Sequence, residues 1–231
     1  MAERTLTGFL KIALAPAHTT MYIWGGGWNA AGDGAGTDAL RIGPSPKWKE
    51  FYNKQSESYD FKEHKFEHGS GLDCSGFVGW AVYNLLGGNG YVTQAQAQAG
   101  MLGSLGLGSC IKNCKKFMPG DIVSASGHVY IVIGECTDTS AVIVHSSPPG
   151  VQLCGTSTRG GNEISRAAAL VRKYTAKYYP DWYKKLGSCR RGLSYFQDCT
   201  VFRWSENVLP DCDNLKSMCA EQILGLLYSR K

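Results

Sequence analysis

The sequence predicts an α+β fold from three observations. Apolar residues recur at spacings of three and four between residues 72 and 88, which is typical of a helix that packs against a core. Residues 116–147 contain runs rich in Val, Ile and Tyr that are broken by turn residues, which is typical of antiparallel strands. Residues 213–231 again have helical spacing. No break in composition separates these parts, so we expect a single domain over residues 1–231.

The first half of the chain carries three predicted elements before its main helix. Residues 3–15 predict a short helix that ends before Pro16, and MYIWGGG at 21–27 predicts a short strand that runs into glycines. Residues 28–71 predict a long loop with a short helix around KWKEFYNKQ. The helix within 72–88 follows, with Gly87-Gly88 as its stop signal.

The second half predicts an antiparallel meander and two further helices. Residues 89–109 predict a short helix and then a loop. Residues 116–135 predict a turn at Pro119-Gly120-Asp121 and two strands, and 140–147 predicts a third strand that ends at Pro148-Pro149-Gly150. We expect 151–164 to be a loop and 165–179 a helix. The sequence then predicts a last strand at 199–204 and a helix that begins at an Asp cap near residue 213.

Composition and charge exclude several classes of protein. The 231 residues are 43% hydrophobic and 19% charged, which is typical of a globular chain. The net charge of +5 suits an anionic polymer such as a cell wall, but it is too small to indicate nucleic acid, and no dense Lys/Arg block is present. No stretch approaches the ~18 apolar residues of a membrane span. We therefore expect neither a nucleic-acid partner nor a membrane span.

The nine cysteines leave two interpretations open. An odd number fits one reactive thiol plus up to four disulfides in an oxidising compartment, and it also fits nine free thiols. The cysteines outside the 72–88 helix lack the tight C-x2-C pairs of zinc sites, so we expect no metal or other cofactor. Residues 1–16 contain GFLKIALAPA, which is too short for a convincing secretory signal, so a removed signal and another export route both remain open.

Cys74 is the candidate nucleophile. Asp73 is a good N-cap, which places Cys74 in the first turn of the helix, where free N–H groups and the helix dipole favour an anion. We expect a lowered thiol pKa there and a reactive thiolate. The alternative is a buried cysteine that merely begins a helix.

Two histidines can complete a thiol-dependent site. His128 begins one predicted strand and His145 ends the next, and an antiparallel pairing brings such positions together. Thiol catalysis needs an imidazole to take the proton of the sulfur and a third polar group to orient that imidazole. Cys74, His128 and His145 provide this set. Taken singly, each histidine also fits a half-exposed side chain at a strand end.

Five motifs in order resemble one family. They are Tyr22-Ile23-Trp24-Gly25-Gly26, Asp73-Cys74-Ser75-Gly76-Phe77-Val78, Pro119-Gly120-Asp121, GHVYIVIG and His145-Ser146-Ser147. Over residues 20–155 the chain resembles the NlpC-type family, papain-like cysteine endopeptidases that cut bacterial peptidoglycan. The family often has an Arg in the block after the nucleophile helix, whereas this chain has Tyr91-Val92-Thr93-Gln94.

The resemblance implies a role for each matched residue. Cys74 would attack the scissile carbonyl, His128 would be the general base and then the acid, and His145 would orient His128. The backbone N–H of Cys74 and the side chain of Tyr22 would stabilise the oxyanion. Asp73 and Ser75 would hold the free amine of the stem peptide. The implied fold is papain-like, an antiparallel sheet packed against the nucleophile helix, with an N-terminal loop and a helical extension over 165–231.

The expected function is cleavage of peptidoglycan stem peptides at the γ-D-glutamyl–diamino acid bond by a secreted, monomeric cell-wall hydrolase. Two alternatives remain. An amidase or acyl transferase would use the same thiol on another amide, and a non-catalytic module would bind peptidoglycan without cutting it.

Overall fold

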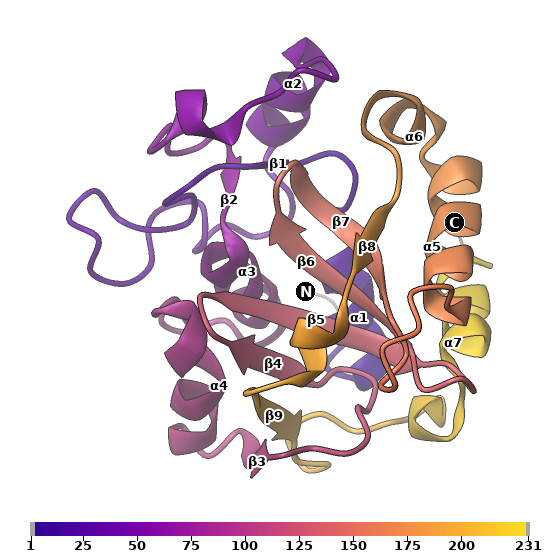
Figure 1. Ribbon diagram of the computed structural model, residues 1–231. Coiled ribbons are helices and arrows are strands. Elements are labelled where there is room, and N and C mark those ends of the chain that lie inside the picture. The colour runs from indigo at the N-terminus through magenta and orange to yellow at the C-terminus, as the bar shows by residue number, and fades with distance from the viewer. Residues whose placement is uncertain (1–2, 230–231) are drawn as a thin grey trace.

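The described part of the chain has a mixed α+β architecture in which seven α-helices pack around a curled sheet of nine strands (Figure 1). The computed structural model describes residues 3–229. The strands are β1 (Met21–Tyr22), β2 (Gly71–Leu72), β3 (Gly108–Lys112), β4 (Ile122–Ala125), β5 (His128–Glu135), β6 (Ala141–Ser147), β7 (Gly150–Thr156), β8 (Cys189–Arg191) and β9 (Thr200–Trp204).

The centre of the sheet is the predicted antiparallel meander. Strands β4, β5, β6 and β7 follow one another in space as in sequence, and β9 and β3 continue the sheet beyond β4. Two strands pair with the edge of β7 that faces away from β6. β1 pairs with its first residue, Gly150, and β8 runs parallel to its second half from Cys154. The predicted loop at 151–164 is therefore wrong in its first half, because β7 is a fully buried strand.

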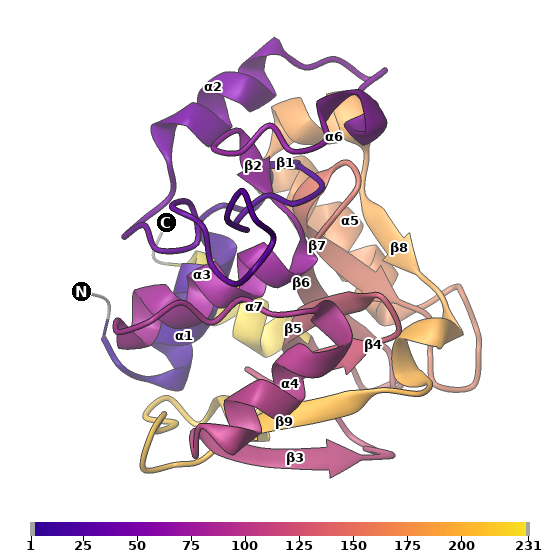
Figure 2. The ribbon, with the colours of Figure 1, turned by 90° about the vertical axis from the view of Figure 1, so that its left-hand side faces the viewer.

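The helices are α1 (Leu6–Leu14), α2 (Pro46–Lys54), α3 (Cys74–Leu86), α4 (Ala95–Ser104), α5 (Arg166–Tyr178), α6 (Pro180–Leu186) and α7 (Ala220–Tyr228). Most of them cover one face of the sheet. Their apolar residues form a single large core with the side chains of β4–β7 and β9 that point the same way. In Figure 2, α1 and α3 lie on one side of the sheet and β8 lies on the other.

Helix ends follow local sequence signals, with one correction. Thr5, Asp73 and Ser165 cap α1, α3 and α5, each accepting a backbone N–H of the first turn. The predicted C-terminal helix does not begin at Asp213. A short 3-10 turn occupies Leu215–Ser217, and α7 begins after Cys219. The last two residues of the predicted helix, 230 and 231, lie outside the described residues.

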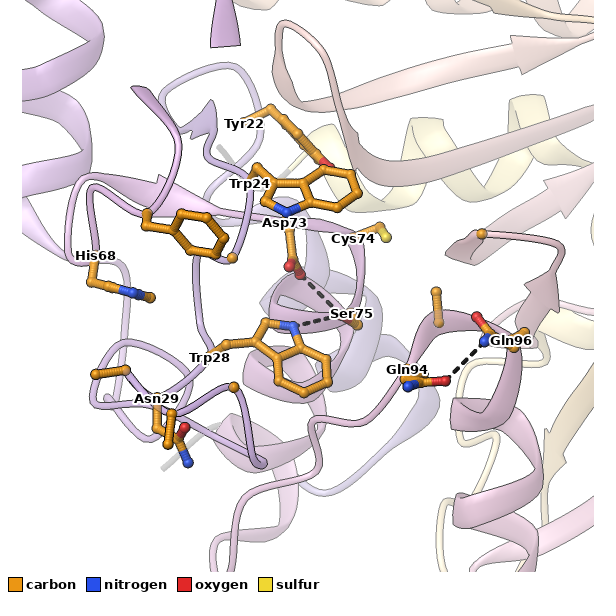
Figure 3. A pocket seen from close by; sticks show the side chains of 17 residues that line it. Tyr22, Trp24, Trp28, Asn29, His68, Asp73, Cys74, Ser75, Gln94 and Gln96 are labelled. Atoms are coloured by element: carbon orange, nitrogen blue, oxygen red, sulfur yellow. Dashed lines mark hydrogen bonds between the residues drawn. The ribbon is translucent and has the colours of Figure 1, made fainter. Parts of the chain in front are cut away.

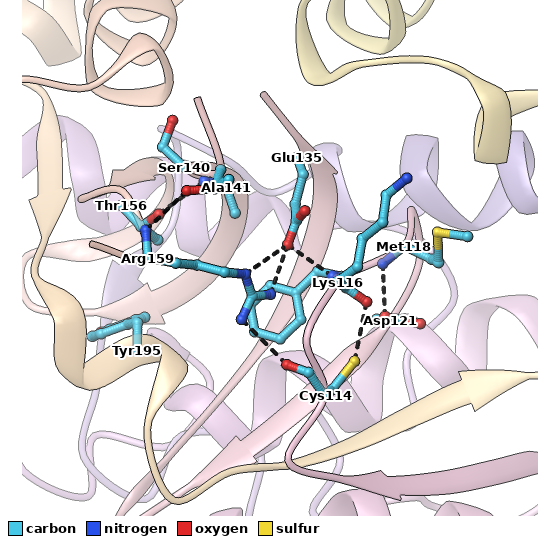
Figure 4. A network of polar contacts seen from close by, with 12 residues as sticks. Cys114, Lys116, Met118, Asp121, Glu135, Ser140, Ala141, Thr156, Arg159 and Tyr195 are labelled. Atoms are coloured by element: carbon cyan, nitrogen blue, oxygen red, sulfur yellow. Dashed lines mark hydrogen bonds and ion pairs between the residues drawn. The ribbon is translucent and has the colours of Figure 1, made fainter. Parts of the chain in front are cut away.

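The second face of the sheet carries a smaller core, which the segment 189–196 covers. Arg159 links several segments on this face of the sheet (Figure 4). Its guanidinium donates to Glu135 and to the Cys114 carbonyl, and it lies between the rings of Phe117 and Phe196, 4.6 and 4.5 Å from their centroids. A charged group that is both paired and stacked holds these segments of the chain together.

The Asp of the Pro119-Gly120-Asp121 turn has a structural role. Asp121 is buried, accepts the N–H of Met118 at 2.8 Å, and pairs with two guanidinium nitrogens of Arg203 in β9 at 2.9 and 2.7 Å. The turn is thereby tied to the neighbouring strand.

All nine cysteines are unbridged. Among residues 3–229 no helix is long and apolar enough to cross a membrane.

Candidate active site

Cys74 is the first residue of α3, as the sequence predicts. Asp73 is the N-cap of the helix and has an extended backbone conformation. Its Oδ1 accepts the N–H of Gly76 at 2.7 Å and the hydroxyl of Ser75 at 3.0 Å. Trp28 Nε1 in turn donates to Ser75 Oγ at 3.0 Å. The helix start is therefore held by its own cap and by a side chain of the preceding loop, with Cys74 only 8% exposed.

The thiol of Cys74 is not the low-pKa group that the helix start suggests. Burial, and then the nearby carboxylate of Asp73, raise its pKa to about 12. The backbone N–H groups of Val129, Ser75 and Cys74 itself favour the thiolate, but they are outweighed. The expectation of a lowered pKa is wrong, because desolvation of the sulfur exceeds the effect of the helix N-terminus. At rest Cys74 is a neutral thiol.

His128 and His145 come together as the sequence predicts. Nε2 of His128 lies 2.9 Å from Nδ1 of His145, across the pair β5 and β6. Burial lowers the pKa of His128 to about 4, and burial together with His128 lowers that of the fully buried His145. Both rings are neutral at pH 7, so only one of the two nitrogens that face each other carries a hydrogen.

Cys74 and His128 lie on opposite faces at the start of β5. Cys74 shares the helix-side core with Val129, whereas the His128 ring packs with Tyr130 and Tyr195 on the other face, at centroid distances of 6.1 and 5.5 Å. Within residues 3–229 no hydrogen bond joins the Cys74 sulfur to the His128 ring. The two residues are nevertheless neighbours, since the sulfur interacts with the N–H of Val129, the residue after His128.

The thiol borders a cavity of about 580 Å³ (Figure 3). Aromatic rings form much of its wall, and two of them, Trp24 and Phe66, are 51% and 59% exposed at its rim. Tyr22, Asp73 and Ser75 also line it, so the predicted substrate residues all lie beside the nucleophile. Burial, Cys74 and Asp73 raise the pKa of Tyr22, which keeps its hydroxyl protonated as a hydrogen-bond donor.

Asp73 has an unusual carboxylate. Burial raises its pKa to about 6, against the effect of its hydrogen bonds from the helix start. It is therefore ionised at neutral pH but protonates in mild acid. A buried anion in a pocket wall favours a cationic ligand group such as an amine.

Sequence reasoning missed two groups of site residues. Gln98 donates to the carbonyls of Ser75 and Tyr91 at 3.0 and 2.7 Å, which ties α4 to the nucleophile helix. Behind His145, the atoms of His145, Cys154 and Cys189 that could ligate a metal lie within 4.8 Å of one another. Nothing in the sequence links Cys189 with His145.

No protein-family model, curated protein or solved structure matches the chain.

Proposed function

We propose that the chain is a cysteine endopeptidase of the NlpC type, with a papain-like arrangement, that cuts peptidoglycan stem peptides at the γ-D-glutamyl–diamino acid bond. The proposal includes a secreted, cell-wall location and a monomeric state. One observation carries it. A cysteine at a capped helix start borders a cavity of about 580 Å³, and a hydrogen-bonded histidine pair lies on the neighbouring strands β5 and β6.

The neutral resting state dictates the order of proton movement. The first proton transfer requires the His128 side chain to turn over the start of β5, because its ring and the Cys74 sulfur lie on opposite faces at rest. The S–H proton of Cys74 then passes to Nδ1 of His128 as the sulfur attacks the scissile carbonyl, since Nε2 is the nitrogen that faces His145. The His128 imidazolium then protonates the leaving amine as the C–N bond breaks. Water hydrolyses the thioester, His128 again taking a proton, and the thiol is regenerated. His145 stabilises the imidazolium in each half of the reaction.

The pocket supplies the other requirements. The N–H groups at the start of α3 and the Tyr22 hydroxyl are donors for the oxyanion. The Asp73 carboxylate suits the free amine of the stem peptide, and the rings of Trp24 and Phe66 offer stacking surface at the rim.

The test is mass spectrometry of products from L-Ala-γ-D-Glu-diaminopimelate, with wild type, Cys74→Ala and, as a matched control, Cys136→Ala, which removes another buried thiol. Wild type and Cys136→Ala should release L-Ala-D-Glu, and Cys74→Ala should release none. Cleavage by Cys74→Ala would disprove the assignment. Adding an acceptor amine separates hydrolysis from acyl transfer, since only a transferase forms the new amide.

A further inference from the structure

Two cysteine side chains meet where β8 returns to the sheet. Sγ of Cys189 lies 2.8 Å from Sγ of Cys154, and both residues are unbridged. They are register partners in the parallel pair of β8 and β7, although they are 35 positions apart in the sequence. The fold therefore brings together two thiols that no local motif links.

The geometry of this pair suits a disulfide. Paired strands lie roughly 4.8 Å apart, and disulfides join Cα atoms that are about 4.4–6.8 Å apart. The backbones of β7 and β8 therefore already have a suitable spacing. A bond of about 2.05 Å requires the two sulfurs to approach by about 0.8 Å, which rotation of the two side chains supplies.

A metal ion suits the same place less well. Nε2 of His145 lies 3.4 Å from Sγ of Cys189, so His145, Cys154 and Cys189 offer three ligand atoms. Two thiolates on one tetrahedral zinc ion, with bonds of about 2.3 Å, hold their sulfurs about 3.8 Å apart. The distance of 2.8 Å between the two sulfurs is about 1 Å shorter than that. It is closer to the length of a covalent bond between the sulfurs.

The two thiols differ in their access to a reagent. Cys189 is 8% exposed and lines a surface cavity of about 370 Å³ between α5 and β8, whereas Cys154 is fully buried. An oxidant therefore meets Cys189 first. Cys154 then lies in position to attack the modified sulfur.

We propose that Cys154 and Cys189 are a redox-active pair that a low-molecular-weight disulfide oxidises to an internal disulfide, which fixes β8 to β7. The Cys189 thiolate attacks one sulfur of the oxidant, which forms a mixed disulfide and releases one small thiolate. The Cys154 thiolate then attacks the Cys189 sulfur, which closes the bridge and releases the second small thiolate. The two protons of the cysteine thiols end on the two small thiols, so the protein loses two electrons and the reagent gains them.

The bridge holds a short strand that leads to the histidine pair. β8 is three residues long, and the chain after it carries Tyr195, whose ring packs against His128 and His145 at centroid distances of 5.5 and 5.9 Å. A covalent link at β8 restricts the unfolded chain, so oxidation should raise the midpoint of thermal unfolding by about 10 °C. This inference is independent of the proposed function, because no step of it involves Cys74.

The test is peptide mapping of the reduced, native protein after incubation with oxidised glutathione at neutral pH. The remaining thiols are blocked with N-ethylmaleimide during denaturation, and the protein is digested with trypsin. Trypsin places Cys189 in peptide 186–190 and Cys154 in peptide 117–159, which also contains Cys136. We expect mass spectrometry to find these two peptides joined, with two hydrogens fewer than the separate peptides.

Three variants identify the bonded sulfurs. Cys136→Ala removes the other thiol of peptide 117–159 and should retain the joined peptides. Cys154→Ala should lose them and leave glutathione on Cys189, because no thiol is present for the second attack. Cys189→Ala should leave Cys154 unmodified, since the buried thiol does not meet the oxidant.

Two results of the mapping would overturn the inference. One is free Cys154 and Cys189 in wild type after oxidation, or a joined peptide that persists in Cys154→Ala. The other is an equimolar zinc ion, detected by native mass spectrometry, that wild type holds and Cys189→Ala loses, because the two thiols would then be metal ligands.

Thermal unfolding tests whether the bridge fixes β8. The midpoint of oxidised wild type should lie about 10 °C above that of reduced wild type. Cys189→Ala has the same remaining cysteines, so the same treatment should leave its midpoint unchanged. An equal midpoint for bridged and reduced wild type would show that the disulfide does not stabilise the attachment of β8.

Discussion

Asp73 has two separate effects on Cys74. Its carboxylate oxygen caps α3, which fixes the thiol in space, and its charge opposes formation of the thiolate. The first effect needs only an acceptor atom, whereas the second needs the charge. The two are therefore separable by substitution.

Asp73→Asn should make Cys74 more reactive. Asn keeps an oxygen that can accept the N–H of Gly76 and removes the charge that raises the thiol pKa. Each unit by which the pKa falls raises the thiolate fraction roughly tenfold at pH values below it. The pH dependence of iodoacetamide alkylation, followed by mass spectrometry of the Cys74 peptide, measures this change. Because burial is the larger cause, the pKa should stay above the ordinary value.

Asp73→Ala is the control for capping. It removes charge and acceptor together, so we expect a similar rise in alkylation but a loss of about 1 kcal/mol in the free energy of unfolding. Equal alkylation rates in wild type and Asp73→Asn would show that the carboxylate does not control the thiol.

Among the elements, α3 owes its position to glycines that approach closely. A β-carbon at Gly76 would lie 2.1 Å from the carbonyl oxygen of Gly26, and one at Gly27 would lie 2.7 Å from the Cα of Gly76. Gly26 and Gly27 of the loop therefore lie directly against Gly76 of α3. Their contact sets how far Cys74 projects into the pocket.

Gly76→Ala should destabilise the protein by about 2 kcal/mol or more, since backbone atoms and not a flexible side chain must move. Gly100→Ala is the matched control, because Gly100 lies in α4 with open space around it and should gain about 0.5–1 kcal/mol from the lower entropy of the unfolded chain. Urea denaturation measures both. Equal stability of Gly76→Ala and wild type would refute the tight contact.

The elements also show what the sequence could predict. α3 and the strands β4, β5 and β6 have strong periodicity and clear turn residues, and they form as expected. β7 was missed because its run GVQLCGT is short of large apolar residues and places Gln152 and Thr156 at buried positions, so it lacks the continuous apolar run that marks a buried strand. β8 is only three residues long and exists through its parallel pairing with β7. No local pattern specifies such a strand.

The same limit applies to the candidate site. The histidine pair follows from two neighbouring antiparallel strands, and Asp73 caps Cys74 as its position in the sequence indicates. The raised thiol pKa could not be predicted, because it depends on how deeply the fold buries the sulfur. Cys189 reaches His145 only because β8 returns to the sheet from far along the chain.

For the whole molecule, the neutral histidine pair makes stability depend on pH. The pKa of His128 is about 4 in the folded chain, against an ordinary value of 6.5. Between pH 4 and pH 6.5 the unfolded chain therefore binds a proton at this residue and the folded chain does not. Stability from this group is complete above pH 6.5 and is lost as the pH falls toward 4. Asp73 acts in the opposite direction, because its raised pKa removes stability as the pH rises toward 6.

A difference measurement isolates the histidine. The free energy of unfolding of wild type and of His128→Gln, from urea denaturation at pH values from 7 to 4, should diverge as the pH falls, with wild type losing up to about 1.4 kcal/mol more per pH unit. The carboxylates are present in both proteins and cancel. Gly100→Ala changes stability without changing a titrating group, so its curve should run parallel to that of wild type. Parallel curves for His128→Gln as well would mean that His128 is protonated as easily in the fold as outside it, which contradicts a neutral base buried beside His145.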